Sequence, residues 1–229
     1  MSEFESNLAS LHEELTKQGE RVFKITLDGV DAFFDFNESK ARQVIEADQE
    51  VDEVDVKIEC ASIPLLAMGQ TDPYGIRSVL TIVKVNNEME RIADCAVNIA
   101  ESVTVHDSNP NTVMPQTFRV MANSVIGMVR DANRALKDRN HELARQVLLF
   151  DDTVDRFKRE ILLDAQSKIA SGLFTAEFAF NLLTVTKSLE RIADHATNIC
   201  EQVIYLETGQ TVRHNPEGWS EPFDPTSGT

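Results

Sequence analysis

A twelve-residue segment that occurs twice is the feature that most constrains this chain. The first copy, ERIADCAVNIAE, spans 90–101, and the second, ERIADHATNICE, spans 190–201. Nine of the twelve residues are identical, and the copies are 100 residues apart, from position 90 to position 190. Repetition of a whole segment at a fixed spacing indicates an internal duplication. The chain is therefore expected to fold into two similar units.

A second match shows that the duplication extends to the preceding segment of each half. The tetrapeptide ARQV at 41–44 recurs at 144–147, which is 103 residues later. Acidic residues follow both copies at the same spacing, as Asp48 and Asp52 in the first half and as Asp151 and Asp155 in the second. The two halves thus keep one register across two segments, with a three-residue difference between them.

Hydrophobic residues recur at steps of three and four, which predicts helices throughout. Candidate caps such as Asp72, followed by Pro73, mark the ends of these segments. The expected helices cover 3–36, 40–68, 73–105, 116–138, 141–171 and 176–207, with Pro64 as a candidate kink in the second. We therefore predict an all-α fold of two tandem, similar three-helix bundles, with six long helices packed up and down.

The final helix carries the clearest pattern, an apolar seam of the kind expected where helices pack nearly parallel or antiparallel. Its residues are Phe178, Leu182, Val185, Leu189, Ile192, Ala196, Ile199, Val203 and Leu206. We expect this seam to be core. The predicted organisation is a first repeat at 1–107, a linker at 108–110, a second repeat at 111–209, and a polar, disordered tail at 210–229 with Trp219 and Phe223 as docking points.

Composition limits the partners. The chain has 229 residues, with 38 Asp and Glu against 22 Lys and Arg, so its formal charge is −16. This charge argues against nucleic acid and against direct adhesion to anionic lipid. The acidic N-terminus does not resemble a signal peptide, and no apolar run is long enough to span a membrane, which predicts a cytoplasmic protein.

The three cysteines, Cys60, Cys95 and Cys200, are expected to be reduced and buried.

The duplicated helices carry carboxylates at positions i and i+4, which lie on one helical face. Like charges at this spacing repel each other by roughly 0.2–0.5 kcal/mol per pair, which a bound cation would relieve. If the helices pack antiparallel, the pairs on neighbouring helices converge into four carboxylates in each half. The candidate metal ligands are Asp48, Asp52, Glu90 and Asp94 in the first half and Asp151, Asp155, Glu190 and Asp194 in the second.

An all-oxygen set suits hard cations such as Mg, Ca, Mn and oxygen-ligated iron, and it disfavours structural zinc. Four further residues, Asn98, Asn198, Glu101 and Glu201, continue the stripe and are candidates to complete a cluster. An exposed role is favoured for Arg91 and Arg191, and a surface or supporting role for His195.

The duplicated ERIAD segment, the D-x-x-x-D spacing on the preceding helix and the GQTVRH sequence at 209–214 resemble the PhoU family of bacterial phosphate-signalling regulators. The resemblance spans nearly the whole chain. It implies that the eight carboxylates bind metal, with iron clusters first and Mn, Mg or Zn as alternatives. Ala93 and Ala193 depart from a glycine common in the family, and Cys95 replaces the counterpart of His195, so the two sites should differ.

The resemblance further implies a non-enzymatic negative regulator of phosphate uptake and signalling. Its expected partners are the phosphate-responsive sensor histidine kinase and the ATPase subunit of the phosphate ABC transporter, with membrane association only through these partners, and a homodimer is expected.

The main alternative is a carboxylate-bridged di-metal oxidase or metal-storage bundle, although no Glu-x-x-His occurs in either repeated motif. A histidine phosphotransfer module would depend on His195 alone. The chain has no glycine-rich phosphate loop or nucleophile motif, which also argues against an enzyme.

Overall fold

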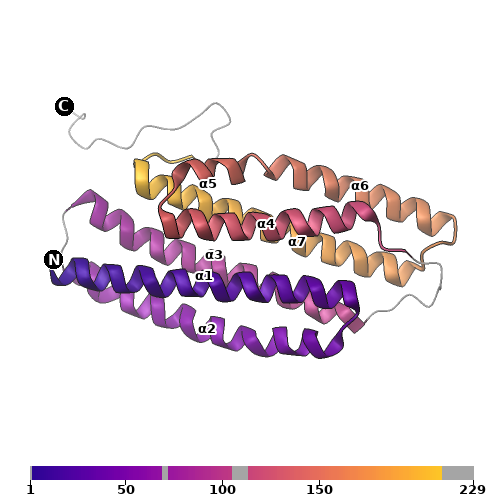
Figure 1. Ribbon diagram of the computed structural model, residues 1–229, viewed down its shortest axis with the longest axis horizontal. Helices are drawn as coiled ribbons and strands as arrows, with labels where there is room; N and C mark the ends of the chain where they lie inside the picture. The colour runs from indigo at the N-terminus through magenta and orange to yellow at the C-terminus, as the bar shows by residue number, and fades with distance from the viewer. Residues whose placement is uncertain (1, 69–71, 105–112, 213–229) are drawn as a thin grey trace.

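A computed structural model describes residues 2–68, 72–104 and 113–212 of the chain, and these residues form an elongated bundle of helices (Figure 1). The first half contains α1 (Glu3–Asp35), α2 (Glu38–Ala67) and α3 (Pro73–Glu101), followed by a short 3-10 helix (Ser102–Thr104). The second contains α4 (Gln116–Asp138), α5 (His141–Leu148), α6 (Asp151–Ala170) and α7 (Ala176–Thr208). The all-α fold of two similar helical halves is confirmed. The predicted linker at 108–110 lies outside the described residues, as does the tail from 213 onward.

Side chains at the helix starts explain where the helices begin. Asn37 caps α2 by accepting a hydrogen bond from the backbone N–H of Lys40 at 3.0 Å, and Asn140 caps α5 in the same way. Asp72 caps α3 at 2.8 Å from the N–H of Gly75, as its sequence predicts. Such caps satisfy backbone donors that have no partner within the helix. The second helix continues past Pro64 to Ala67.

The prediction of one continuous helix over 141–171 is wrong. The chain breaks between α5 and α6 at Leu149 and Phe150, where the N–H of Phe150 donates to the carbonyl of Val147 at 3.0 Å in a tight turn. No side-chain cap opens α6. The two exposed apolar residues at this break make the second half different from the first, in which α2 is continuous.

The core runs through both halves and is centred on α3 and α7, which pack against each other (Figure 1). Helices α1 and α2 cover α3, while α4, α5 and α6 cover α7. All nine predicted seam residues of α7 are buried. Cys95 and Cys200 are buried free thiols, but the expectation that Cys60 is buried is wrong, since it lies exposed on α2.

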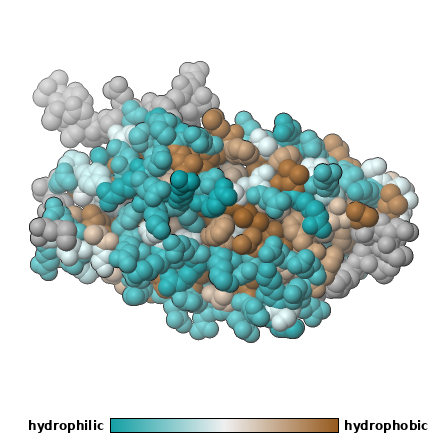
Figure 2. Space-filling model, viewed as in Figure 1, coloured by the Kyte–Doolittle hydropathy of each residue, from teal (hydrophilic) through white to brown (hydrophobic). Residues whose placement is uncertain are grey.

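The surface carries scattered apolar residues among polar ones. Figure 2 shows hydrophobic side chains gathered near the middle of one face, over α4 and its neighbours, between hydrophilic areas. None of the described helices combines the length and the apolar character that crossing a bilayer requires.

Candidate metal centre

In the first half, α2 and α3 bring the predicted carboxylates toward each other. Burial, together with the negative charges of Asp52 and Asp94, raises the pKa of Asp48 to about 6. Burial also raises the pKa of Glu90, and the charge of Asp94 adds to this effect while Arg91 opposes it. Asp94 on α3 acts on Asp48 of α2, and Asp52 on α2 acts on Glu90 of α3, so part of the repulsion acts between the helices. The four acids therefore share one electrostatic environment.

The second half repeats this arrangement on α6 and α7. Burial, followed by the charges of Glu190 and Asp151, raises the pKa of Asp194 to about 6. Burial and the charge of Asp155 raise the pKa of Asp151. When neighbouring negative charges raise the pKa of a carboxylate, binding of a proton or a cation is favoured because it reduces their mutual repulsion. Both carboxylate groups thus have the electrostatic character of a cation-binding site.

The two groups differ in the basic residue that accompanies them. In the second half, the Nζ of Lys158 lies 2.7 Å from the Oε1 of Glu190, and this pairing raises the pKa of the lysine. The position equivalent to Lys158, 103 residues earlier, is Asp55, whose Oδ1 accepts a hydrogen bond from the side-chain amide of Asn86 at 2.6 Å. The first half therefore has an additional acid where the second has an internal cation.

Arg91 is the basic residue of the first group. Its guanidinium lies 3.2 Å from the carboxylate of Glu90 and 3.4 Å from that of Asp94. The arginine side chain is about half exposed, so these pairs contribute little to stability. The expected exposed position of Arg91 is consistent with this geometry, although the side chain also orients two predicted ligands.

The donor set fits a hard cation by its chemistry, since all eight predicted ligands are carboxylates. In the conformation that the described residues adopt, no three Asp, Glu, His or Cys side chains are grouped closely enough to hold a metal ion. The carboxylates therefore share one environment without forming a closed ligand set. The eight-residue metal site stays a prediction.

His195 has a contact that the sequence did not suggest. Its Nδ1 lies 2.7 Å from the Oε2 of Glu88 on α3, and the side-chain amide of Asn198 donates to the same oxygen at 3.0 Å. These residues join the two halves where α3 meets α7. His195 thus has a supporting, partly buried position, and Asn198 turns to Glu88, while the amide of Asn98 donates to the backbone carbonyl of Asp94.

Helical spacing contains part of the signal that the sequence analysis missed. Lys158 follows Asp151 and Asp155 by seven and three residues, which places it on their helical face. Asp55 follows Asp48 and Asp52 at the same distances. Glu88 has no counterpart signal, because its equivalent in the second half is Ser188.

The fold and the site define a class of protein: a duplicated helical bundle with a group of facing carboxylates in each half. A family model described as the PhoU domain matches twice, at residues 15–103 and 118–203. The chain belongs to the PhoU family.

Named relatives agree with this assignment. The chain is 31% identical over 211 residues to the phosphate-specific transport system accessory protein PhoU homolog 1 of Thermotoga maritima, covering 92% of this chain and 91% of that one. It is 32% identical over 213 residues to the PhoU homolog of Clostridium acetobutylicum, covering 93% and 97% of the two chains.

Solved structures agree as well. The crystal structure of PhoU from Pseudomonas aeruginosa matches with a TM-score of 0.82 at 29% identity, covering 90% of this chain and all of that one. The phosphate transport system regulatory protein PhoU from Streptococcus pneumoniae matches with a TM-score of 0.83. That likeness, at 23% identity, concerns the fold alone.

Proposed function

We propose that the chain is an accessory protein of phosphate transport that binds metal and negatively regulates phosphate uptake and phosphate-responsive signalling from the cytoplasm. The observation that carries this proposal is the double match to the PhoU domain, which covers both halves of the fold. The names of the relatives from Thermotoga maritima and Clostridium acetobutylicum, accessory proteins of phosphate-specific transport, support it.

In this proposal the protein acts as a non-enzymatic adaptor, and as a homodimer. It connects the ATPase subunit of the phosphate ABC transporter with the sensor histidine kinase, and it reaches the membrane only through them. The net charge of −16 supports basic protein surfaces as partners rather than nucleic acid or anionic lipid.

The proposed metal ligands are the eight carboxylates of the two groups. Iron is the first candidate, followed by manganese, magnesium and zinc. The electrostatics support this assignment, because Asp48 and Asp194 each have a pKa near 6 that results from burial and neighbouring acids. A divalent cation would relieve the repulsion in each group.

Metal content tests the site directly. The untagged protein is compared by elemental mass spectrometry with a variant carrying Asp48→Asn, Asp52→Asn, Asp151→Asn and Asp155→Asn. A matched control removes the same charge at four exposed acids outside the site, through Glu3→Gln, Asp35→Asn, Asp138→Asn and Glu177→Gln. The proposal expects stoichiometric metal in the wild type and the control, and loss in the site variant. Equal metal in all three proteins would place the binding elsewhere.

The regulatory role is tested in cells that lack their own PhoU protein and carry a reporter induced by phosphate starvation. The wild-type chain should keep the reporter off when phosphate is plentiful, and the purified chain should bind the kinase or the ATPase subunit in calorimetric titration. A reporter that stays on despite normal amounts of folded protein would contradict the proposal.

The alternative function, a di-metal oxidase, predicts that the ferrous-loaded protein consumes oxygen with turnover, whereas the adaptor predicts no such consumption.

A further inference from the structure

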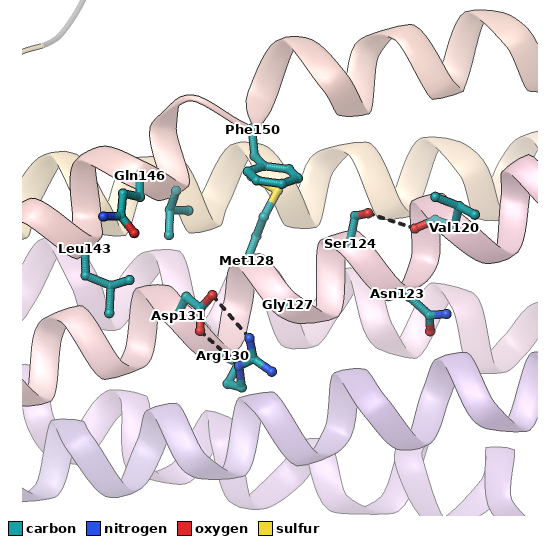
Figure 3. Close-up of a pocket in the computed structure, with 11 residues that line it drawn as sticks. Val120, Asn123, Ser124, Gly127, Met128, Arg130, Asp131, Leu143, Gln146 and Phe150 are labelled. Atoms are coloured by element: carbon teal, nitrogen blue, oxygen red, sulfur yellow. Dashed lines mark hydrogen bonds and ion pairs between the residues drawn. The ribbon is translucent and has the colours of Figure 1, made fainter.

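The second half contains an apolar groove between α4 and the α5–α6 break. It has a volume of about 460 Å³ and is lined by residues including Val120, Met128, Leu143 and Phe150 (Figure 3). Figure 3 shows Phe150 at the start of α6 with the side chain of Met128 pointing toward it, while Gly127 lies on α4 below. Phe150 is half exposed. The groove thus has a glycine without a side chain on α4 and an aromatic side chain at its edge.

The first half has an equivalent but smaller groove, which three basic side chains line. That groove, of about 240 Å³, is lined by Arg21, Lys24, Lys40 and Ala47, among others. Its positions correspond to those of the second groove at a spacing of 103 residues, which is also the spacing between the left-handed helix ends at Phe36 and Arg139. The two grooves therefore differ in the side chains that line them and not in their place in the repeat.

Four lining positions distinguish the two grooves. The positions equivalent to Arg21, Lys24, Lys40 and Ala47 are occupied by Ser124, Gly127, Leu143 and Phe150.

In the first half, ion pairs hold two of the basic side chains. Arg21 lies 2.7 Å from Glu50, and Lys40 lies 3.0 Å from Asp31. In the second half, a Cβ added at Gly127 would have no atom within 4 Å. Loss of three basic side chains and gain of two large apolar ones accompany a larger groove in the second half, about 460 Å³ against about 240 Å³.

We infer that this groove binds the chain's own segment 213–229 through Trp219 and Phe223. The segment follows Val212, which packs against the core after α7, and α7 packs against α5, the wall of the groove. In Figure 1 the chain turns back after α7 at the end of the molecule where α5 begins. An extended chain spans at most about 3.3–3.6 Å per residue, so Trp219 and Phe223 reach about 23 Å and 36 Å beyond Val212. The eight-residue helix α5 is only about 12 Å long.

Charge complementarity favours the same occupant. Helix α4 is the one described helix in which basic residues outnumber acidic ones, with four Lys and Arg against two Asp. The segment 213–229 carries three acids, Glu217, Glu221 and Asp224, against the single base Arg213. Two of these acids flank Trp219 and the third follows Phe223. An acidic aromatic segment thus meets the most basic helix of an acidic protein.

Trp219 is the only tryptophan of the chain, so its fluorescence reports on the segment without a label. The full chain is compared with Gly127→Lys, which restores the residue of the first half and fills the groove. Gly127→Ala is the control, because it adds a methyl group to open space without filling the groove. Circular dichroism checks that all three proteins are helical.

The inference expects blue-shifted emission and protection from acrylamide quenching in the wild type and in Gly127→Ala. It expects a red shift and loss of protection in Gly127→Lys. Wild-type emission equal to that of the denatured chain would overturn it, as would a protected tryptophan that Gly127→Lys leaves unchanged. Protection that depends on protein concentration would mean that the segment enters a second copy, which would overturn docking within one chain.

Discussion

Asp48 and Asp194 lie at different positions of the repeat but have similar electrostatic environments. Each has its pKa raised to about 6 by burial and by acids on its own and the neighbouring helix. Such a group binds protons more strongly in the folded state than in the unfolded chain, where its pKa is near 3.8. Its contribution to stability is fully present below the unfolded pKa and is lost as the pH rises through about 6. The carboxylates therefore oppose folding at neutral pH unless a cation binds.

The first prediction concerns this pH dependence. The midpoint of thermal unfolding of the metal-free protein should rise as the pH falls from 7 to 5, because Asp48 and Asp194 take up protons in the folded state. Asp48→Asn should raise the midpoint at pH 7 and reduce the change between pH 7 and 5. Calorimetric scans in a chelating buffer measure both effects. A wild-type midpoint that falls over this range, in parallel with that of the variant, would contradict the prediction.

Lys158 sets the second prediction, which depends on the proposed metal site. A divalent cation near Glu190 must displace the ammonium group of Lys158 or bind beside it. At a separation of about 6 Å in water, the ammonium group repels a divalent cation by about 1.4 kcal/mol. Lys158→Gln should therefore tighten Mn²⁺ binding in the second half by about tenfold. The titration is made in a chain whose first site is disabled by Asp48→Asn and Asp52→Asn.

Lys168→Gln is the matched control on the same helix. This lysine pairs with Asp164, which is not one of the four predicted metal ligands of the second half. It should leave the affinity within a factor of about two. An unchanged affinity in Lys158→Gln, with measurable Mn²⁺ binding, would show that the lysine does not compete. Absence of binding in every variant would instead contradict the metal site itself.

At the scale of the helices, two glycines at different depths test how closely the elements pack. Both lie inside helices, where glycine costs about 0.8–1.0 kcal/mol relative to alanine. A Cβ at Gly29 of α1 would lie 3.0 Å from the backbone carbonyl oxygen of Ala96 on α3, whereas a Cβ at Gly127 meets nothing within 4 Å. Gly29 therefore permits the close approach of α1 to α3.

The third prediction follows from this difference. Gly127→Ala should raise the free energy of unfolding by about 0.8–1.0 kcal/mol, the difference in helix propensity. Gly29→Ala should lower it by about 1 kcal/mol, because crowding of a packed core costs about 1–3 kcal/mol and exceeds the gain. Urea unfolding monitored by circular dichroism measures both. Equal changes in the two variants would mean that α1 can move away from α3 without cost.

The helices also show what the sequence could and could not predict. The apolar seam of α7 and the cap at Asp72 could be predicted because periodicity and capping are local properties. The break at Leu149 and Phe150 was not, since neither residue is Gly or Pro and the same register continues unbroken through α2. Such a break is decided by tertiary packing rather than by local preference.

The same division holds for the site. Spacing along each helix predicted which acids share a face, and the electrostatic effects between helices agree with that grouping. Lys158 lies on the same helical face as Asp151 and Asp155, so its place beside them follows from spacing alone. Glu88 could not be found from either repeat, because its role arises only where α3 of one half packs against α7 of the other.

At the scale of the whole molecule, the two halves form one core rather than two. Buried apolar residues of both repeats belong to a single cluster, and polar contacts cross between the halves. The side-chain amide of Asn181 donates to the carbonyl of Ser102 at 2.9 Å, and that of Asn133 donates to the carbonyl of Gly19 at 2.7 Å. We therefore expect the repeats to unfold together in one transition.

The fourth prediction tests the contact of Glu88 on α3 with His195 and Asn198 on α7. Glu88→Ala leaves the Nδ1 of His195 and the amide of Asn198 without their shared acceptor in a partly buried place, and an unsatisfied group of this kind costs about 1–3 kcal/mol. Urea unfolding should show one transition with its midpoint lowered accordingly. Ser188→Ala is the control at the equivalent position of the second half, where the hydroxyl donates only to its own helix at 3.3 Å and its loss should matter little.

A double-mutant cycle separates this contact from a general effect of Glu88 on α3. If the carboxylate acts through His195, then Glu88→Ala and His195→Ala together should cost less than the sum of the single changes, with a coupling of about 0.5–3 kcal/mol. Additive costs would assign the effect of Glu88 to other neighbours. Two separate unfolding transitions in Glu88→Ala would go further, because they would mean that this one partly buried contact, and not the continuous apolar core, makes the two repeats a single folding unit.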